Sequence, residues 1–213
     1  MAPLAGKPVL CHTVAALLSI PAIEGIVVTA STETLETYRH LLETAFPGTN
    51  LRFTTGGSSR RASVYRGLLA LPENASIVLI HDAARPLIQT QTIQRALQPV
   101  EQGAIGSVVA IPVVDTLKTV VSGSQALHIE QTVDRQCFWR AQTPQIFQLN
   151  VLRQAHEQVP QDAAVTDDAQ LLELLKLGPL QIVPGESSNL KITTPEDLTL
   201  AEWYLKSQIA KRD

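Results

Sequence analysis

Short runs of β-branched and aliphatic residues alternate along this chain with longer stretches in which apolar residues recur at helical spacing. Residues 25–30, 51–54 and 76–80 predict strands, and residues 33–44 and 60–71 between them predict helices. This alternation of strand and helix is typical of an α/β fold with a mostly parallel sheet flanked by helices.

The run Ile77–Ile80 contains four consecutive aliphatic residues with no polar alternation. Such a strand is expected to be buried on both faces, and we predict that it lies in the centre of the sheet rather than at an edge. The remaining pattern predicts strands at 107–111 and 181–183 and helices at 9–18, 90–101, 148–158, 167–176 and 195–210, the last with Thr194 as its N-cap.

Residues 114–135 have a different pattern. Two β-rich pieces, 115–121 and 126–132, flank Ser122-Gly123-Ser124, which is a hairpin signal. Their apolar side chains have no obvious place in the parent sheet. We therefore predict a β-arm that projects from one domain spanning residues 1–213.

Composition narrows the class of protein. The 213 residues are 45% hydrophobic and 17% charged, as expected for one folded globular domain. A net charge of -3 gives no general attraction for nucleic acid or an anionic membrane, so phosphate recognition would depend on locally gathered cations. No apolar run is long enough to span a bilayer, and Cys11 and Cys137 suggest buried free thiols, so we expect a cytoplasmic protein.

Asp82 and Arg85 directly follow the apolar run Ile77–Ile80. In open α/β sheets the ligand crevice lies at the carboxyl ends of the strands, so an acid and a cation at this point suit a phosphate-bearing ligand. The alternative is an ordinary surface ion pair.

Three further groups of residues are candidates for ligand binding. Gly56 and Gly57 precede a helix that carries Ser63, and such a turn lets a ligand approach the backbone closely, although it is also a routine connection. Lys191 lies between apolar neighbours, where it could neutralise phosphoryl charge or simply extend its amine into solvent. Arg135, at the return of the arm, is a candidate whose alternative is a plain surface arginine.

The order of these segments resembles one enzyme family, 2-C-methyl-D-erythritol 4-phosphate cytidylyltransferase. The resemblance runs from about Gly6 to the C-terminus. It is carried by Gly56-Gly57 with Arg60 and Ser63, and by residues 81–86, 115–118, 132–135, 142–147, 166–168 and 189–198.

The resemblance implies a Rossmann-like nucleotidyltransferase fold whose arm builds a homodimer. It also implies a reaction of the non-mevalonate isoprenoid pathway, in which CTP and methylerythritol phosphate give the cytidine diphosphate alcohol and pyrophosphate. Mg²⁺ is expected on the CTP phosphates, with no metal ligands from the protein.

The same resemblance assigns the site residues. The nucleotide would contact Gly56, Gly57, Ser63, Asp82 and Ala83, and the catalytic pair would be Lys191 and Asp82. The alcohol phosphate would contact Asp82, Thr166 and Lys191 of one subunit, and Arg85, Thr116 and Arg135 from the partner's side.

Two departures from the family pattern affect these expectations. The family's glycine-rich triphosphate loop has no counterpart in these 213 residues, and Ser58 stands where relatives often have Asp. We therefore expect little activity from the chain as given. The alternatives are a relative that uses another polyol phosphate, such as ribitol 5-phosphate, and an inactive dimer-forming paralogue.

Overall fold

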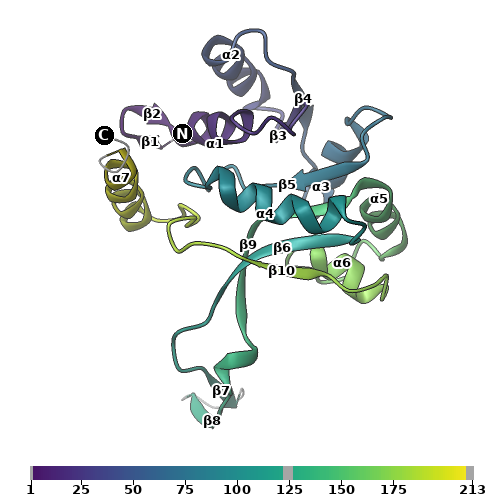
Figure 1. Cartoon of the computed structure of the whole chain (residues 1–213), viewed down its shortest axis with the longest axis vertical. Coiled ribbons are helices and arrows are strands. Elements are labelled where there is room, and N and C mark those ends of the chain that lie inside the picture. The colour runs from purple at the N-terminus through teal and green to yellow at the C-terminus, as the bar shows by residue number, and fades with distance from the viewer. Residues whose placement is uncertain (1, 122–126, 210–213) are drawn as a thin grey trace.

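A computed structural model describes residues 2–121 and 127–209 of the protein. Its main sheet has four strands in the order β10-β6-β9-β5 (Figure 1). These strands are β10 (Gln181–Pro184), β6 (Gly106–Pro112), β9 (Trp139–Gln148) and β5 (Ile77–Ile80). β10 and β6 are parallel, whereas β9 is antiparallel to both β6 and β5. The sheet is therefore mixed, because the chain leaves the body along β6 and returns along β9.

A second, two-stranded parallel sheet pairs β3 (Ile26–Ala30) with β4 (Leu51–Thr55), which are joined through helix α2 (Leu35–Ala45). Ahead of it, the short hairpin of β1 (Pro3–Leu4) and β2 (Lys7–Pro8) leads into α1 (Val9–Leu18). The strands and helices expected in this part of the chain are confirmed to within two residues at each end.

The expected helices in the rest of the chain are also confirmed. Thr194 caps the last of them, because its hydroxyl accepts a hydrogen bond from the Asp197 amide at 3.3 Å. These helices are α3 (Arg60–Leu69), α4 (Thr90–Glu101), α5 (Leu149–Gln158), α6 (Ala169–Leu174) and α7 (Pro195–Ile209).

The core lies on both faces of the four-stranded sheet. Phe147 and Ile146 of β9 are neighbours in sequence and point to opposite faces, and neither is exposed to solvent. Phe147 packs in the cluster that contains Leu152 of α5, and Ile146 packs with Val100 of α4. The sheet is thus covered by helices on both sides, which leaves the ends of its strands to carry a site.

The central position predicted for β5 is wrong for the described residues, in which β5 pairs only with β9 and lies at one edge of the sheet. The prediction that both of its faces are covered is confirmed. Val78 packs in the cluster of α5 and α6, and Leu79 packs on the opposite side with residues of α4. A run of apolar residues indicates that both faces of a strand are covered, but it does not indicate which strands lie beside it in the sheet.

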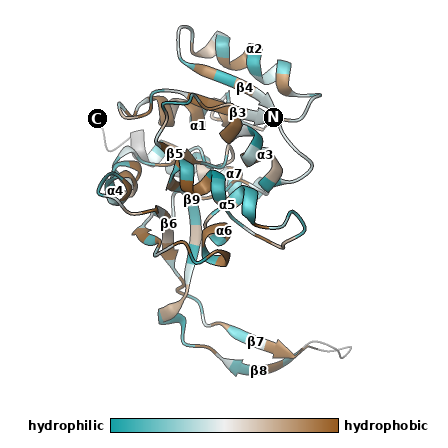
Figure 2. Cartoon of the chain, turned by 90° about the vertical axis from the view of Figure 1, so that its right-hand side faces the viewer, coloured by the Kyte–Doolittle hydropathy of each residue, from teal (hydrophilic) through white to brown (hydrophobic). Residues whose placement is uncertain are grey.

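The arm is confirmed as a projecting antiparallel hairpin of β7 (Lys118–Val121) and β8 (His128–Thr132). Figures 1 and 2 show it extending away from the body, at the opposite end of the molecule from α2. The expected turn Ser122-Gly123-Ser124 and residue 126 lie outside the described residues. Val121, Leu127 and Ile129 are 53%, 75% and 66% exposed, so the arm presents apolar side chains to solvent.

The expectation of two buried thiols is half wrong. Cys11 is buried on α1, but Cys137 is exposed in the short 3₁₀ helix η1 (Arg135–Cys137) at the base of the arm. The apolar context of Cys137 in the sequence belongs to the arm, whose side chains are solvent-exposed in the single chain. No helix in the described part of the protein is long and apolar enough to cross a membrane.

Candidate functional site

A cluster of charged side chains surrounds Asp82, at the carboxyl end of β5. One Asp82 carboxylate oxygen lies 3.2 Å from the Lys191 amine and 3.3 Å from Nε of Arg85. The other oxygen lies 3.9 Å from Nε of Arg60. Burial alone raises the pKa of Asp82, but Lys191, Arg85 and Arg60 outweigh it and hold that pKa below its ordinary value. Asp82 is therefore ionised at neutral pH.

The three cations differ in how far they reach solvent. The side chains of Lys191 and Arg60 are 44% and 38% exposed, whereas that of Arg85 is only 12% exposed. Burial lowers the pKa of Arg85, and the nearby Asp82 carboxylate opposes that shift. Positive charge therefore exceeds the charge of Asp82, and it faces solvent through Lys191 and Arg60. This arrangement suits a phosphate group.

A chain of hydrogen bonds holds the Asp82 loop against β9. The Asp82 amide donates to the Thr143 hydroxyl at 3.0 Å, and that hydroxyl lies 3.0 Å from Nδ1 of His81. Nε2 of His81 lies 3.0 Å from the Arg85 carbonyl. Because a carbonyl can only accept, Nε2 carries the proton and Nδ1 accepts from Thr143. His81 is therefore a neutral imidazole that fixes both ends of the loop.

Asn189 joins this loop to two other segments. Its side-chain amide donates to the Gln142 side chain at 3.0 Å and to the Thr143 carbonyl at 2.9 Å, and it is buried. Its backbone carbonyl accepts a 2.7 Å hydrogen bond from the guanidinium of Arg85. Segments that are far apart in the sequence, at residues 81–86, 142–147 and 189–198, thus form one hydrogen-bonded assembly that positions Asp82 and Lys191.

The neutral state of His81 predicts a specific pH dependence of stability. Burial lowers the pKa of His81 from 6.5 to about 4. Between these pH values the unfolded chain binds a proton that the folded chain does not bind. The free energy of unfolding should therefore fall as the pH drops from about 6.5 to 4, by a total of about 3 kcal/mol from this group.

Urea unfolding at pH 7 and pH 4 would measure this contribution. We expect His81→Gln to lose less stability over that interval than the parent protein, whereas the same change at the exposed His40 should match the parent. Equal losses in all three proteins would show that His81 is not held neutral by the fold.

The glycine pair lies where β4 meets α3. The Gly57 amide donates to the Ser63 hydroxyl at 3.0 Å, and this bond holds the glycine loop against the first turn of α3. A Cβ on Gly57 would lie 2.4 Å from the side chain of Ala62, and one on Gly56 would lie 2.8 Å from the Ser63 hydroxyl. Both glycines are thus required by close packing on α3, before any ligand is considered.

The structure brings most of the predicted nucleotide and substrate residues to one region. Arg60, the first residue of α3, connects the turn of Gly56, Gly57 and Ser63 to the Asp82 cluster. Ala83 follows Asp82, and its carbonyl accepts a hydrogen bond from Thr13 of α1 at 2.7 Å. The exposed Thr166 contacts Gln170 and lies two residues before Asp168, which forms an ion pair with Arg60.

Within this chain Arg85 lies beside Asp82, close to Lys191. Its assignment to the partner's side with Thr116 and Arg135 stays a prediction from the resemblance. Thr116 precedes β7 and Arg135 begins η1, so both lie at the base of the arm, and Arg135 donates to the carbonyl of Val114. The single chain thus collects Asp82, Arg85 and Lys191 and leaves the two arm residues apart from them.

Sequence reasoning assigned no role to several residues of the site. Arg60 appeared only as part of a motif, although it lies in the charged cluster, and its partner Asp168 is 1% exposed. Thr143 and Asn189 hold the assembly together through hydrogen bonds, and both are buried and uncharged. The available signal was that all four belong to the segments that carry the family resemblance.

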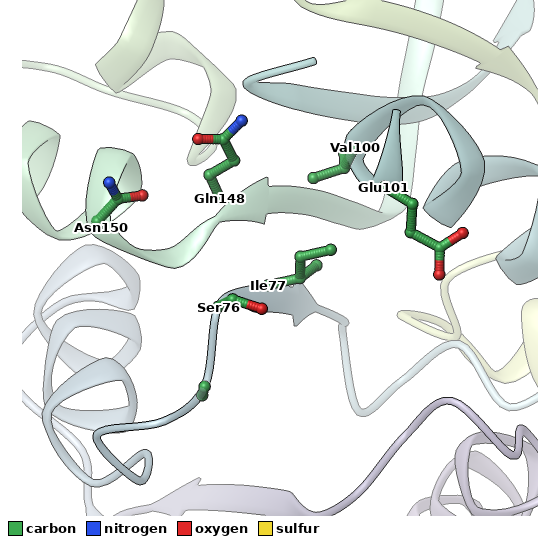
Figure 3. Close-up of a pocket in the computed structure, with 7 residues that line it drawn as sticks. Ser76, Ile77, Val100, Glu101, Gln148 and Asn150 are labelled. Carbon is green, nitrogen blue, oxygen red and sulfur yellow. The ribbon is translucent and has the colours of Figure 1, made fainter. Parts of the chain in front are cut away.

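Two cavities lie at opposite ends of the strands. One of about 260 Å³ is lined by Val28, Thr29, Ala83, Ala84 and Ile192, and so adjoins the Asp82 loop. A larger one of about 380 Å³ lies at the amino end of β5, between Ser76, Val100, Glu101, Gln148 and Asn150 (Figure 3). Neither cavity is lined by Asp82, Arg60, Arg85 or Lys191, but the smaller one is lined by Ala83 and Ile192, the sequence neighbours of Asp82 and Lys191, and therefore lies nearer the charged cluster.

Comparison with known proteins agrees with this geometry. The family model described as 2-C-methyl-D-erythritol 4-phosphate cytidylyltransferase matches residues 1–207. A protein of that name from Gloeobacter violaceus is 44% identical over 97% of this chain and 88% of its own length. Another from Thermosynechococcus vestitus is 45% identical over 95% of this chain and 85% of its own length.

Solved structures show the same relationship. The 4-diphosphocytidyl-2C-methyl-D-erythritol synthase of Anaerococcus prevotii superposes with a TM-score of 0.86 at 27% identity, covering 96% of this chain and 91% of that one. The cytidylyltransferase of Thermus thermophilus gives a TM-score of 0.79 at 31% identity, with 96% and 92% covered. The α/β architecture with its projecting arm is therefore a nucleotidyltransferase fold, and the chain belongs to the 2-C-methyl-D-erythritol 4-phosphate cytidylyltransferase family.

Proposed function

We propose that this protein joins CTP to 2-C-methyl-D-erythritol 4-phosphate, giving 4-diphosphocytidyl-2-C-methyl-D-erythritol and pyrophosphate in the non-mevalonate isoprenoid pathway. The observation that carries the proposal is the charged cluster at the carboxyl end of β5, the place where open α/β sheets have their ligand crevice. There an ionised Asp82 is surrounded by Lys191, Arg85 and Arg60, and two of the cations reach solvent. Family membership supplies the identity of the two substrates.

The reaction needs alignment and charge neutralisation more than proton transfer. An oxygen of the alcohol phosphate attacks the α-phosphorus of CTP, forming a new P–O–P link, while the α–β anhydride bond breaks and its electron pair leaves with pyrophosphate. The attacking oxygen is already anionic, so no general base is required. Lys191 would hold the attacking phosphate and offset the charge that develops on the phosphoryl group.

The nucleoside end would bind at the turn of Gly56, Gly57 and Ser63, with Asp82 and Ala83 facing the ribose. Supporting this placement, the turn and the Asp82 loop are connected through Arg60, and the smaller cavity reaches Ala83. The Gly56 and Gly57 amides donate to the Ala30 carbonyl at 2.7 Å and to the Ser63 hydroxyl at 3.0 Å, so carbonyl lone pairs of the turn would be the groups that meet the amino edge of cytosine.

Magnesium would be carried by the nucleotide. In the described part of the chain no group of three or more His, Cys, Asp or Glu side chains is placed to hold a metal ion. Asp82, the carboxylate nearest the proposed phosphates, is already engaged by three cations. We propose that Mg²⁺ binds through the CTP phosphates and takes no ligand from these residues. The role that we propose for the protein is to bind and orient the charged nucleotide.

We also propose that the protein works in the cytoplasm as a homodimer built by the arm, in which Thr116 and Arg135 of one subunit reach the alcohol phosphate of the other. The support is that both residues lie on the projecting segment, whose apolar side chains are exposed in the single chain. The two cysteines are free thiols, as is usual in a reducing compartment.

The test is CTP-dependent release of pyrophosphate with each of two alcohol phosphates. We expect turnover with methylerythritol 4-phosphate and, at the same concentration, at least about a hundredfold less with ribitol 5-phosphate, because contacts to the wrong polyol leave buried polar groups unpaired. Mass spectrometry should identify the cytidine diphosphate alcohol.

The assay should be run on the 213-residue chain and on a form extended by a family-type strand and glycine-rich loop. We expect the extended form to be the faster, since the loop supplies triphosphate contacts. A preference for ribitol 5-phosphate would reassign the substrate. Absence of turnover in both forms with either alcohol phosphate would favour the inactive paralogue.

A further inference from the structure

We propose that Arg60 is a second anion-binding cation of the crevice, opposite Lys191, and that buried Asp168 is the residue that positions it. The inference deepens the proposed function, on which it depends for the identity of the anion. That anion is the phosphate group of the alcohol phosphate. The argument starts from the surroundings of Asp168.

Asp168 lies at the start of α6 and only 1% of its side chain is exposed. One carboxylate oxygen is 2.8 Å from an Nη atom of Arg60, and the other is 3.5 Å from Nε2 of His156, whose side chain is equally buried. A buried carboxylate without a cation is strongly unfavourable, so the ion pair with Arg60 is required by burial. Asp168 therefore holds one end of the guanidinium at a fixed point.

The wall behind this ion pair is rigid. The His156 ring stacks on Tyr65 of α3 with a centroid distance of 5.5 Å and an interplanar angle of 15°. The neighbouring Arg61 is buried and donates to the carbonyls of His156 and Pro160 at 3.1 and 2.6 Å, which ties α3 to the end of α5. The two consecutive arginines thus have different roles. Arg61 connects α3 to the end of α5, and Arg60 extends to the charged cluster around Asp82.

The guanidinium of Arg60 spans two carboxylates. Its first Nη atom meets Asp168, its Nε lies 3.9 Å from Asp82, and 38% of its side chain is exposed. Within residues 2–121 and 127–209 the second Nη atom has no hydrogen-bond or ion-pair partner. An arginine presents five N–H donors in a planar fork, so donors remain for a ligand once the two carboxylates are satisfied.

The position of these donors indicates which phosphate they meet. Lys191 and Arg60 lie on the two oxygens of the Asp82 carboxylate, so a phosphate above Asp82 lies between two cations. Thr166, a proposed contact of the alcohol phosphate, is two residues before Asp168, on the same loop that holds Arg60. The arrangement therefore favours the alcohol phosphate over the leaving pyrophosphate.

The experiment compares Arg60→Gln with Arg52→Gln, which removes an exposed arginine of β4 outside the crevice. We expect Arg60→Gln to raise both the KM and the calorimetric Kd for methylerythritol 4-phosphate by about 10- to 100-fold, the scale for losing a charged hydrogen bond. The kcat should change by less than about threefold, because a contact kept from ground state to transition state affects binding alone. Arg60→Lys should recover part of the affinity.

Binding of inorganic phosphate separates this inference from the proposed function. If no alcohol phosphate is turned over, the proposed function fails, but Arg60→Gln should still bind inorganic phosphate more weakly than Arg52→Gln. A folded Arg60→Gln protein with phosphate affinities equal to those of Arg52→Gln would overturn the anion-binding role, whatever its thermal midpoint.

The positioning role of Asp168 is tested by a double-mutant cycle. Asp168→Asn should weaken phosphate binding in the parent protein, but it should weaken binding no further when it is added to Arg60→Gln, because Asp168 acts through Arg60. The control is Asp162→Asn, at an exposed aspartate before α6. If Asp168→Asn does not fold, Asp168→Glu keeps the charge and moves the carboxylate. Independent, additive losses, or unchanged phosphate affinity in either folded variant, would overturn the positioning role.

Discussion

Replacing Lys191 by alanine is expected to lower turnover about a hundredfold or more, a loss of about 3 kcal/mol of transition-state stabilisation. The Lys191 amine lies 3.2 Å from Asp82 and remains 44% exposed, so it can contact a phosphoryl group without leaving its carboxylate partner. Charge builds on that group as the new P–O bond forms, and in the variant Arg60 cannot take the place of the amine, because Asp168 holds it beside the other oxygen of Asp82. Steady-state kinetics at saturating CTP would measure the effect.

The matched control is Lys206→Ala, which removes an exposed lysine from α7 without touching the Asp82 cluster. We expect its turnover to equal that of the parent protein. The thermal midpoint of Lys191→Ala should also be recorded, because Asp82 keeps Arg85 and Arg60 as partners and the fold should persist. A fall of less than threefold in a folded Lys191→Ala protein would remove Lys191 from the catalytic residues.

Deleting the arm is expected to abolish both dimer formation and binding of the alcohol phosphate. The arm carries exposed apolar side chains that a partner would cover, and it also carries Thr116 and Arg135. Contiguous apolar surface of this kind is an association site in a soluble protein. Sedimentation should show a dimer for the parent protein and a monomer for the deletion variant, and calorimetry should show no binding of methylerythritol 4-phosphate to the variant.

The structure indicates where to make the deletion. The Val113 amide donates to the Phe138 carbonyl at 3.1 Å, so β6 and β9 are already adjacent at the base of the arm and a short glycine turn can join them. Two point substitutions give a less disruptive test than the deletion. Ile129→Ser on the arm is compared with Leu174→Ser on α6, at residues that are 66% and 52% exposed. We expect only Ile129→Ser to weaken the dimer. A deletion variant that remains fully active as a monomer would refute the shared site.

Local periodicity accounts for what could be predicted of the fold. The helices and the strands of β3, β4, β6 and β10 were found because the spacing of apolar residues reflects which faces are buried. β9 was not predicted as a strand. Its sequence, Trp139–Gln148, mixes polar and apolar residues even in its buried part, where Gln142, Thr143 and Gln145 form hydrogen bonds with distant segments.

The candidate site divides in the same way. Asp82, Arg85 and Lys191 were found because charged residues beside apolar strands are conspicuous in a sequence and because their segments resemble those of a known family. The neutral state of His81 and the ion pair between buried Asp168 and Arg60 depend on atoms contributed by β9, α5 and α6. Their partners are separated by many residues, so no local pattern reports them.

The sequence by itself determined the α/β class, the arm, the family and three of the charged residues that meet at the carboxyl end of β5, namely Asp82, Arg85 and Lys191. Only the tertiary structure decided that β9 runs antiparallel to its neighbours, that β5 lies at an edge in the described residues, and that Arg85 lies beside Asp82. The physical reason is that whether a residue is buried depends on its position along its own helix or strand, so burial leaves a local pattern of apolar residues in the sequence. Strand order and ion pairing depend on which distant segments meet, and this is settled when the whole core packs together.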